Sequence, residues 1–332
     1  MNSRPAYASV IDPIGPAIER VRTVLFRPFD LGKWCVIGLS AWLAQLGSGG
    51  GNGGPGGSGD NGPGGPHQPE DITEEIRHGY EAARDYVTAN LHWILPVAIF
   101  ALIVFITVWL LLTWLSSRGR FTFLYCVAQN KGEFWNPWRL LRPHGNSLFG
   151  FRVALGIIGF LTGAACLAGG GVLAFFSYKT LGFTALTILG LVMCGLLFFT
   201  SVIVFGIIGA FTTDFVVPIM YLRRLRCRPA WRVFLEVLAE NKGRFLVYLL
   251  FRIVIGVAIG SLLVAVSCAT CCIACCLFKV PYVGAVLLLP VSMFERSYSL
   301  YYLAQYGPQF NVFAPEPAPE PEVVEPNPGW QS

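Results

Sequence analysis

The chain has 332 residues, of which 54% are hydrophobic and only 13% are charged, and its formal net charge is +5. Ordinary soluble domains are less apolar, and roughly 25% of their residues are charged. The composition therefore excludes an ordinary soluble domain. It indicates an all-helical integral membrane protein.

Six apolar segments predict transmembrane helices, because about 20 helical residues cross the roughly 30 Å of hydrocarbon in a bilayer. They cover residues 31–47, 93–115, 150–176, 183–211, 250–278 and 281–303 within a membrane domain of residues 1–313. The first segment alone is marginal in length. The N-terminal residues lack the apolar core of a signal peptide, so we expect the first helix to act as its own insertion signal.

The placement of basic residues favours six crossings over five. With six, 20 of the 24 Lys and Arg residues fall on one side of the membrane, whereas five crossings divide them much more evenly. The side rich in Lys and Arg is the cytoplasm by the positive-inside rule. We therefore expect both termini in the cytoplasm.

Two regions outside the crossings differ from the rest in composition. Residues 48–92 are predicted to be extracytoplasmic, with a flexible Gly-rich linker followed by an amphipathic helix that begins at the capping box Asp71–Glu74. Residues 314–332 are rich in Pro and Glu, which is typical of a disordered tail, here on the cytoplasmic side.

An internal repeat links three segments that each follow an inward crossing. Arg120–Phe134, Trp231–Phe245 and Arg296–Phe310 align without gaps and share Leu, Ala and Phe at equivalent positions. The pattern predicts three hairpins of two transmembrane helices, each followed by a cytoplasmic amphipathic helix at the membrane surface. The basic residues near these helices suit anionic lipid headgroups, although topology alone also places them there.

Small residues on two of the crossings predict close helix packing. Gly159 and Gly163, and likewise Gly256 and Gly260, are four residues apart. Such spacings allow helix backbones to approach each other. We expect packing within one chain rather than dimerisation.

Charges within or beside the apolar segments are the main candidates for a functional site, because a charge at membrane depth is costly. They are Arg152, Asp214, Arg252, Glu295 and Arg296. Two interpretations remain open. The charges either pair with one another and snorkel toward the cytoplasm, or they line a pathway for a substrate or protons.

A cysteine-rich stretch, CATCCIACC, lies toward the outer end of the fifth crossing. Its cysteines fall on one helical face: Cys268, Cys271, Cys272, Cys275 and Cys276. Thiolates in this arrangement suit a soft metal such as Cu(I) or Zn(II). Buried cysteine also behaves as a small hydrophobic residue, and this packing interpretation is favoured. We predict no cofactor and assign no metal site.

Three stretches carry a resemblance to a known family: FRPFDLGKWCVIGLSAWLAQLGSGGG, FTTDFVVPIMYLRRLRCRPAWRVF and FERSYSLYYLAQYG. The chain resembles an uncharacterised family of prokaryotic multi-pass membrane proteins known only as a domain of unknown function. It is more distantly similar to the membrane domain of some glycerophosphodiester phosphodiesterases. The resemblance implies a fold and a location in the prokaryotic plasma membrane. The catalytic phosphodiesterase barrel is absent from this chain, so that activity does not carry over.

No nucleophile, general base and orienting group can be assembled from the sequence, so we expect no catalytic activity. The leading prediction is a membrane scaffold or lipid-interacting module, with membrane lipids as partners and no nucleic acid. The alternatives are a transporter of small solutes or ions, which would use Asp214, Arg252, Glu295 and Arg296 around a cavity, or a metal-handling protein. A hydrated cavity that reaches these charges favours transport, whereas a packed interior favours the scaffold.

Overall fold

The structure is a computed structural model that describes residues 9–46, 85–86, 88–180, 185–270, 280 and 282–313. In these residues all regular secondary structure is helical. The longer helices are α2 (Leu31–Gln45), α4 (Leu91–Gln129), α6 (Arg142–Thr180), α7 (Ala185–Phe211), α9 (Cys227–Glu240), α10 (Lys242–Ala269) and α13 (Leu289–Ala304). The shorter ones are α1 (Ile14–Val21), α5 (Trp135–Leu140), α8 (Val217–Arg223), α12 (Val283–Leu287) and the turns η1 (Arg22–Phe26), η2 (Thr212–Val216) and η3 (Pro308–Phe310).

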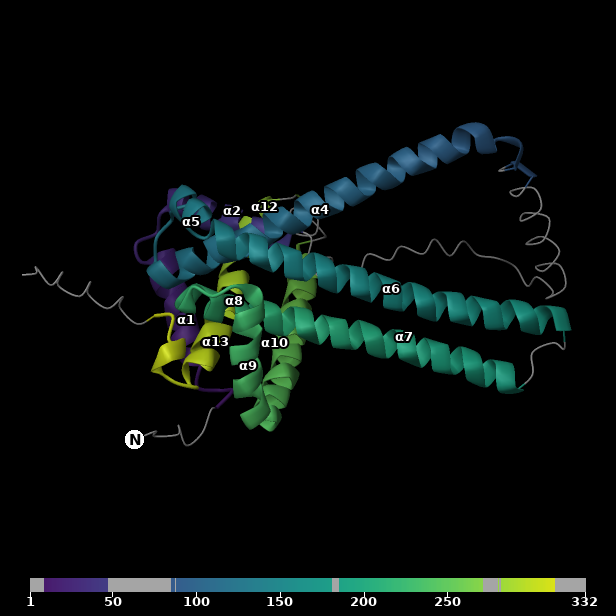
Figure 1. The fold of residues 1–332 in the computed structure, drawn as a ribbon. Helices are drawn as coiled ribbons and strands as arrows, with labels where there is room; N and C mark the ends of the chain where they lie inside the picture. Colours follow the sequence, from purple (N-terminus) through teal and green to yellow (C-terminus); the bar gives the residue numbers. More distant parts are fainter. Residues whose placement is uncertain are drawn as a thin grey trace, which may run out of the picture.

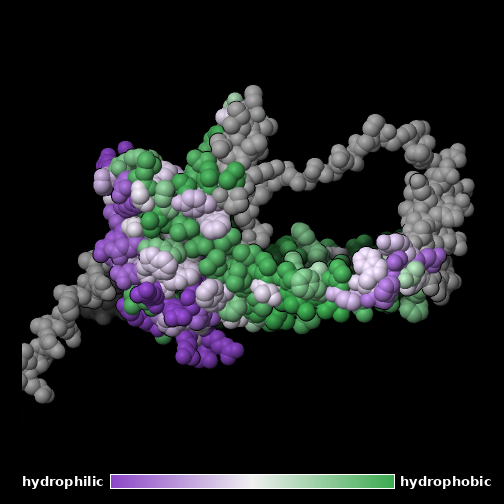
Figure 2. Space-filling model, turned by 90° about the horizontal axis from the view of Figure 1, so that it is seen from above, coloured by the Kyte–Doolittle hydropathy of each residue, from purple (hydrophilic) through white to green (hydrophobic). Residues whose placement is uncertain are grey.

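Four helical stretches are long and apolar enough to cross a membrane. They are Leu91–Gln129, Arg142–Ser177, Ala185–Arg223 and Lys242–Ala269. Figure 2 shows hydrophobic residues covering the long helices, while hydrophilic residues gather at one end of the molecule and in a smaller group at the other. This distribution matches a bilayer around the projecting parts of α4, α6 and α7, and it indicates a membrane protein.

The short helices and one end of the long helices form a compact body, here called the head. In Figure 1, α6 and α7 leave the head side by side, and α4 diverges from them. The transition is visible along α4, whose side chains are largely exposed up to Leu111 and mostly buried from Thr113 to Ala128. A helix of 39 residues is about 58 Å long at ~1.5 Å per residue. It is therefore long enough to cross the hydrocarbon and continue into the head.

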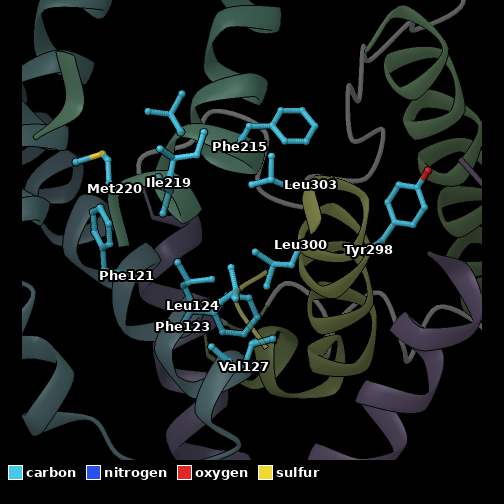
Figure 3. Close-up of a cluster of buried hydrophobic side chains, with 14 of the residues drawn as sticks. Phe121, Phe123, Leu124, Val127, Phe215, Ile219, Met220, Tyr298, Leu300 and Leu303 are labelled. Carbon is cyan, nitrogen blue, oxygen red and sulfur yellow. The ribbon is translucent and has the colours of Figure 1, made fainter. Parts of the chain in front are cut away.

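Four elements supply most of the core of the head. Figure 3 shows buried side chains from the end of α4, from η2 and α8, and from α13 meeting in one cluster. Phe215 of η2 is fully buried, and its ring stacks on Phe234 of α9 with centroids 5.3 Å apart. The core thus fixes the position of the turn η2, which lies beside the candidate site.

The predicted repeat segments do not form three equivalent surface helices. Residues 120–129 continue α4 without a break, and residues 296–304 belong to α13; both stretches contribute to the core, for example through Leu124 and Leu300. Only α9 is a separate helix, and its Leu235 is exposed. The apolar faces of the other two segments are covered by protein rather than by lipid.

The remaining two predicted crossings correspond to shorter helices. Residues 31–47 contain α2, which has 15 residues, and residues 281–303 are divided into α12 and α13 near Leu288. The Gly-rich linker, the capping box and the tail 314–332 lie outside the described residues.

The two glycine pairs lie in different surroundings. A Cβ at Gly159 would be 3.6 Å from Phe205, and one at Gly163 would be 3.5 Å from Phe198, so this pair packs α6 against α7. A Cβ at Gly256 or Gly260 would meet no atom within 4 Å. The second pair therefore does not pack against another described helix.

Candidate functional site: an arginine-lined cavity

A cavity of about 760 Å³ lies where the long helices enter the head. Residues of α2, α4, α6, α7, η2, α10 and α13 line it. Its charged lining residues, here called the floor, are Arg120, Arg152, Asp214, Arg252, Glu295 and Arg296. All five charges predicted from the sequence lie in the floor, although they come from four separate elements.

Arg120 is the floor residue that the sequence analysis did not single out. It follows the apolar segment 93–115 by five residues and begins the repeat segment Arg120–Phe134, which is predicted to be a cytoplasmic amphipathic helix at the membrane surface. Because α4 continues through this position, Arg120 reaches the cavity instead. A helical pattern that extends past the end of the apolar segment is the signal that points to it.

The turn η2 presents Thr213 to two arginines. Arg120 Nη1 donates a hydrogen bond to the Thr213 hydroxyl, and Arg296 Nη1 donates to the Thr213 carbonyl oxygen. This turn has π-helical geometry, which is rare and often occurs at functional sites. It fixes two guanidinium groups from different helices beside the same residue.

Asp214 is the buried anionic partner in the floor. It is 6% exposed, forms an ion pair with Arg252, and accepts a hydrogen bond of 3.0 Å from the Tyr248 hydroxyl. Both partners lie on α10, one helical turn apart. Asp214 therefore neutralises one of the four arginines of the floor.

The other two charged side chains of the floor are held differently. Arg152 Nη1 donates hydrogen bonds to the hydroxyls of Ser116 and Ser117 of α4, over 3.0 and 3.4 Å. Glu295 is exposed at the cavity. Among the described residues the floor holds four arginines and two carboxylates, and its formal net charge is +2.

Arg296 has donors that nothing in the described part of the chain satisfies. Arg296 is only 7% exposed, and its Nε and Nη2 atoms are buried without a hydrogen-bond partner. Buried guanidinium groups are normally paired, because a buried donor without an acceptor costs free energy. An acceptor that reaches this edge, such as an oxygen of an anion, would remove that cost.

The cysteine stretch is only partly described. Cys268 is exposed at the end of α10, while Cys271, Cys272, Cys275 and Cys276 lie outside the described residues. The metal and packing interpretations therefore both stay predictions.

The long apolar helices and the charged cavity at one end of them indicate a helical membrane protein with a cationic internal site. A family model described as Family of unknown function (DUF7544) matches residues 8–288, so the chain belongs to this family. No curated protein and no solved structure matches the chain. The likeness to the membrane domain of glycerophosphodiester phosphodiesterases stays a prediction from the sequence.

Proposed function

We propose that this chain is a non-catalytic, multi-pass membrane protein that binds an anionic ligand in the arginine-lined cavity. The observation that carries the proposal is Arg296, whose buried Nε and Nη2 lack partners beside a cavity of formal net charge +2. A cationic cavity that is partly enclosed by protein strengthens the attraction of an anion, because the local dielectric constant is lower than in bulk water. A packed scaffold would need neither the cavity nor the unsatisfied donors.

We also propose that the protein crosses a prokaryotic plasma membrane six times with both termini in the cytoplasm. The head contains α2, while α4 begins at the end far from the head (Figure 1). With the head on one side of the membrane, α4 therefore begins on the other side. This change of side between α2 and α4 supports an odd number of crossings before α4, in agreement with a first crossing at residues 31–47 and a total of six. In this orientation the floor faces the cytoplasmic leaflet, where anionic lipid headgroups are also expected.

Thermal unfolding in a neutral detergent tests the binding proposal. Sodium phosphate should raise the unfolding temperature more than sodium chloride does at equal ionic strength, since a ligand that binds only the folded state stabilises it. Arg296→Gln should lose most of this difference, and Arg152→Gln provides a second floor variant. Arg139→Gln, which removes an exposed arginine of α5, is the matched control and should retain the response.

Equal responses of wild type and both floor variants would contradict the proposal. A phosphate response lost to the same extent in Arg139→Gln would assign the effect to general surface charge. Circular dichroism without phosphate identifies any variant that fails to fold.

A transporter of small anions is the second candidate function. The cavity reaches the predicted charges, and its lining continues along α6, α7 and α10 toward the middle of the apolar helices. Uptake of radiolabelled phosphate into proteoliposomes tests this alternative. Uptake by wild type that is abolished in Arg296→Gln would favour transport, whereas binding without uptake would favour a binding module.

A further inference from the structure

The cavity has two chemically distinct parts. Beyond the floor, it is lined by apolar residues and glycines, here called the wall: Trp109, Leu155, Gly156, Gly159, Phe205, Gly206, Gly209, Ile255 and Gly256. On α4 and α6 the wall residues lie on the side of the floor arginine that faces away from the head. The charged part is therefore at the head, and the apolar part extends into the spans.

The wall is long enough to follow several bonds of an extended alkyl chain. Gly159 lies seven residues beyond Arg152 on α6, which is about 10 Å along the helix axis. Trp109 lies eleven residues before Arg120 on α4, which is about 16 Å.

Three wall glycines leave space that no other described atom fills. A Cβ at Gly206, Gly209 or Gly256 would meet nothing within 4 Å. These glycines are therefore not required for helix packing, and their effect is to widen the cavity. An apolar space inside a membrane protein favours an apolar occupant, because water there would lack hydrogen-bond partners.

The floor favours a headgroup with two or more oxygens. The unsatisfied Nε and Nη2 of Arg296 form one edge of the guanidinium group, and their two N–H bonds run nearly parallel. Such an edge matches two oxygens of one phosphate or carboxylate, and a halide cannot fill both positions. The formal net charge of +2 suits a phosphate monoester, which carries roughly −1.5 to −2 at neutral pH.

We propose that the ligand of the cavity is an anionic amphiphile, with a phosphate monoester headgroup on the floor and an alkyl chain along the wall. This inference rests on the proposed anion binding and adds the class of ligand. A free inorganic anion would occupy the floor and leave the wall empty, whereas an amphiphile fills both parts.

Native mass spectrometry of the full chain in a neutral detergent tests the proposal with three probes. These are phosphatidic acid, phosphatidylcholine with the same acyl chains, and glycerol 3-phosphate. Phosphatidic acid should bind at least about tenfold more tightly than glycerol 3-phosphate, since burying only two methylene groups is worth that factor. It should also bind more tightly than phosphatidylcholine, because its phosphate monoester carries more negative charge than the choline-capped diester.

Two pairs of variants separate the floor from the wall. Arg296→Gln should weaken phosphatidic acid binding, while Arg139→Gln should not. Gly209→Leu should fill the wall and weaken phosphatidic acid while leaving glycerol 3-phosphate unaffected. Gly195→Leu is its control, because Gly195 lies on the same helix, has open space beside it and does not line the cavity.

The outcomes distinguish failure of the amphiphile proposal from failure of anion binding. Equal affinity for phosphatidic acid and glycerol 3-phosphate would overturn the amphiphile and leave anion binding in place. Equal affinity for phosphatidic acid and phosphatidylcholine would show that the floor does not select an exposed phosphate monoester. Binding of none of the probes would overturn both proposals.

Discussion

The Tyr248 hydroxyl donates a hydrogen bond of 3.0 Å to Oδ2 of Asp214. Both residues line the cavity, and the carboxylate also forms an ion pair with Arg252. The phenol and the guanidinium group of Arg252 therefore contact the same carboxylate oxygen, Oδ2. The second acidic residue of the floor, Glu295, has no such anchor among the hydrogen bonds of the described residues.

Tyr248→Phe should lower the free energy of unfolding by about 1.5–3 kcal/mol, the usual value for a hydrogen bond to a charged group. Urea titration in mixed micelles, followed by circular dichroism, measures the change. Tyr301→Phe is the control, because the Tyr301 ring stacks on Phe313 and loses no hydrogen bond of the described structure. Equal losses in the two variants would show that the bond to Asp214 contributes nothing.

Phe215→Ala should be severely destabilising, since a buried phenylalanine truncated to alanine typically costs about 3–5 kcal/mol. Phe215 is fully buried and contacts the rings of Phe234, Phe245 and Tyr248. Phe160→Ala removes a ring that is 74% exposed on α6, and it should change stability little. The same urea titration measures the free energy of unfolding of both variants. Similar losses in the two variants would show that the head is not the stable core of the protein.

Gly119→Ala should push α2 away from α4 and thereby lower the thermal unfolding temperature. A Cβ at Gly119 would lie 2.7 Å from the backbone nitrogen of Ala44, which is too close for a real contact. Gly150→Ala on α6 meets nothing within 4 Å and should be neutral or stabilising by up to about 1 kcal/mol through helix propensity. The thermal unfolding temperature of Gly119→Ala should therefore fall, whereas that of Gly150→Ala should stay unchanged or rise. Equal temperatures would disprove the close contact of the two helices.

Cys227 should resist alkylation in the folded protein. Cys227 is only 1% exposed, and burial raises the pKa of its thiol to about 12. At pH 8 only about one thiol in ten thousand is then ionised, and the thiolate is the reactive form. The rate should rise with pH up to this pKa, provided that the fold persists.

The measurement uses variants that keep a single cysteine. Maleimide should modify Cys227 only after unfolding in detergent and urea. Rapid modification of Cys227 at pH 8 in the folded protein would show that α9 does not pack against the head.

The candidate site follows from the sequence in part, because charges that interrupt apolar segments are costly and therefore rare. This argument selected Arg152, Asp214, Arg252, Glu295 and Arg296, and the structure places them around one cavity. It did not reveal the cavity itself. The glycines that widen it, such as Gly206 and Gly209, looked like ordinary small residues of an apolar helix.

Helical periodicity did not predict whether lipid or protein covers the apolar face of each helix. The segments at Leu124 and Leu300 have apolar faces that suit either a membrane surface or a protein core, and tertiary packing decided for the core. Four of the predicted crossings correspond to helices long enough to span a membrane. The full count of six is a prediction, since length and composition alone do not qualify α2 or α13.

Because α4 is continuous from the apolar region into the head, a change in its tilt would move the residues that it contributes to the head. Bilayers of different thickness change the tilt of a spanning helix, since tilting matches its apolar length to the hydrocarbon. Arg120 lies seven residues, or about 10 Å, beyond Thr113, where burial begins. A tilt of about 10° around that point would shift Arg120 by about 2 Å relative to Thr213, enough to lengthen or break their hydrogen bond. A change in membrane thickness that tilts α4 would therefore change the geometry of the floor.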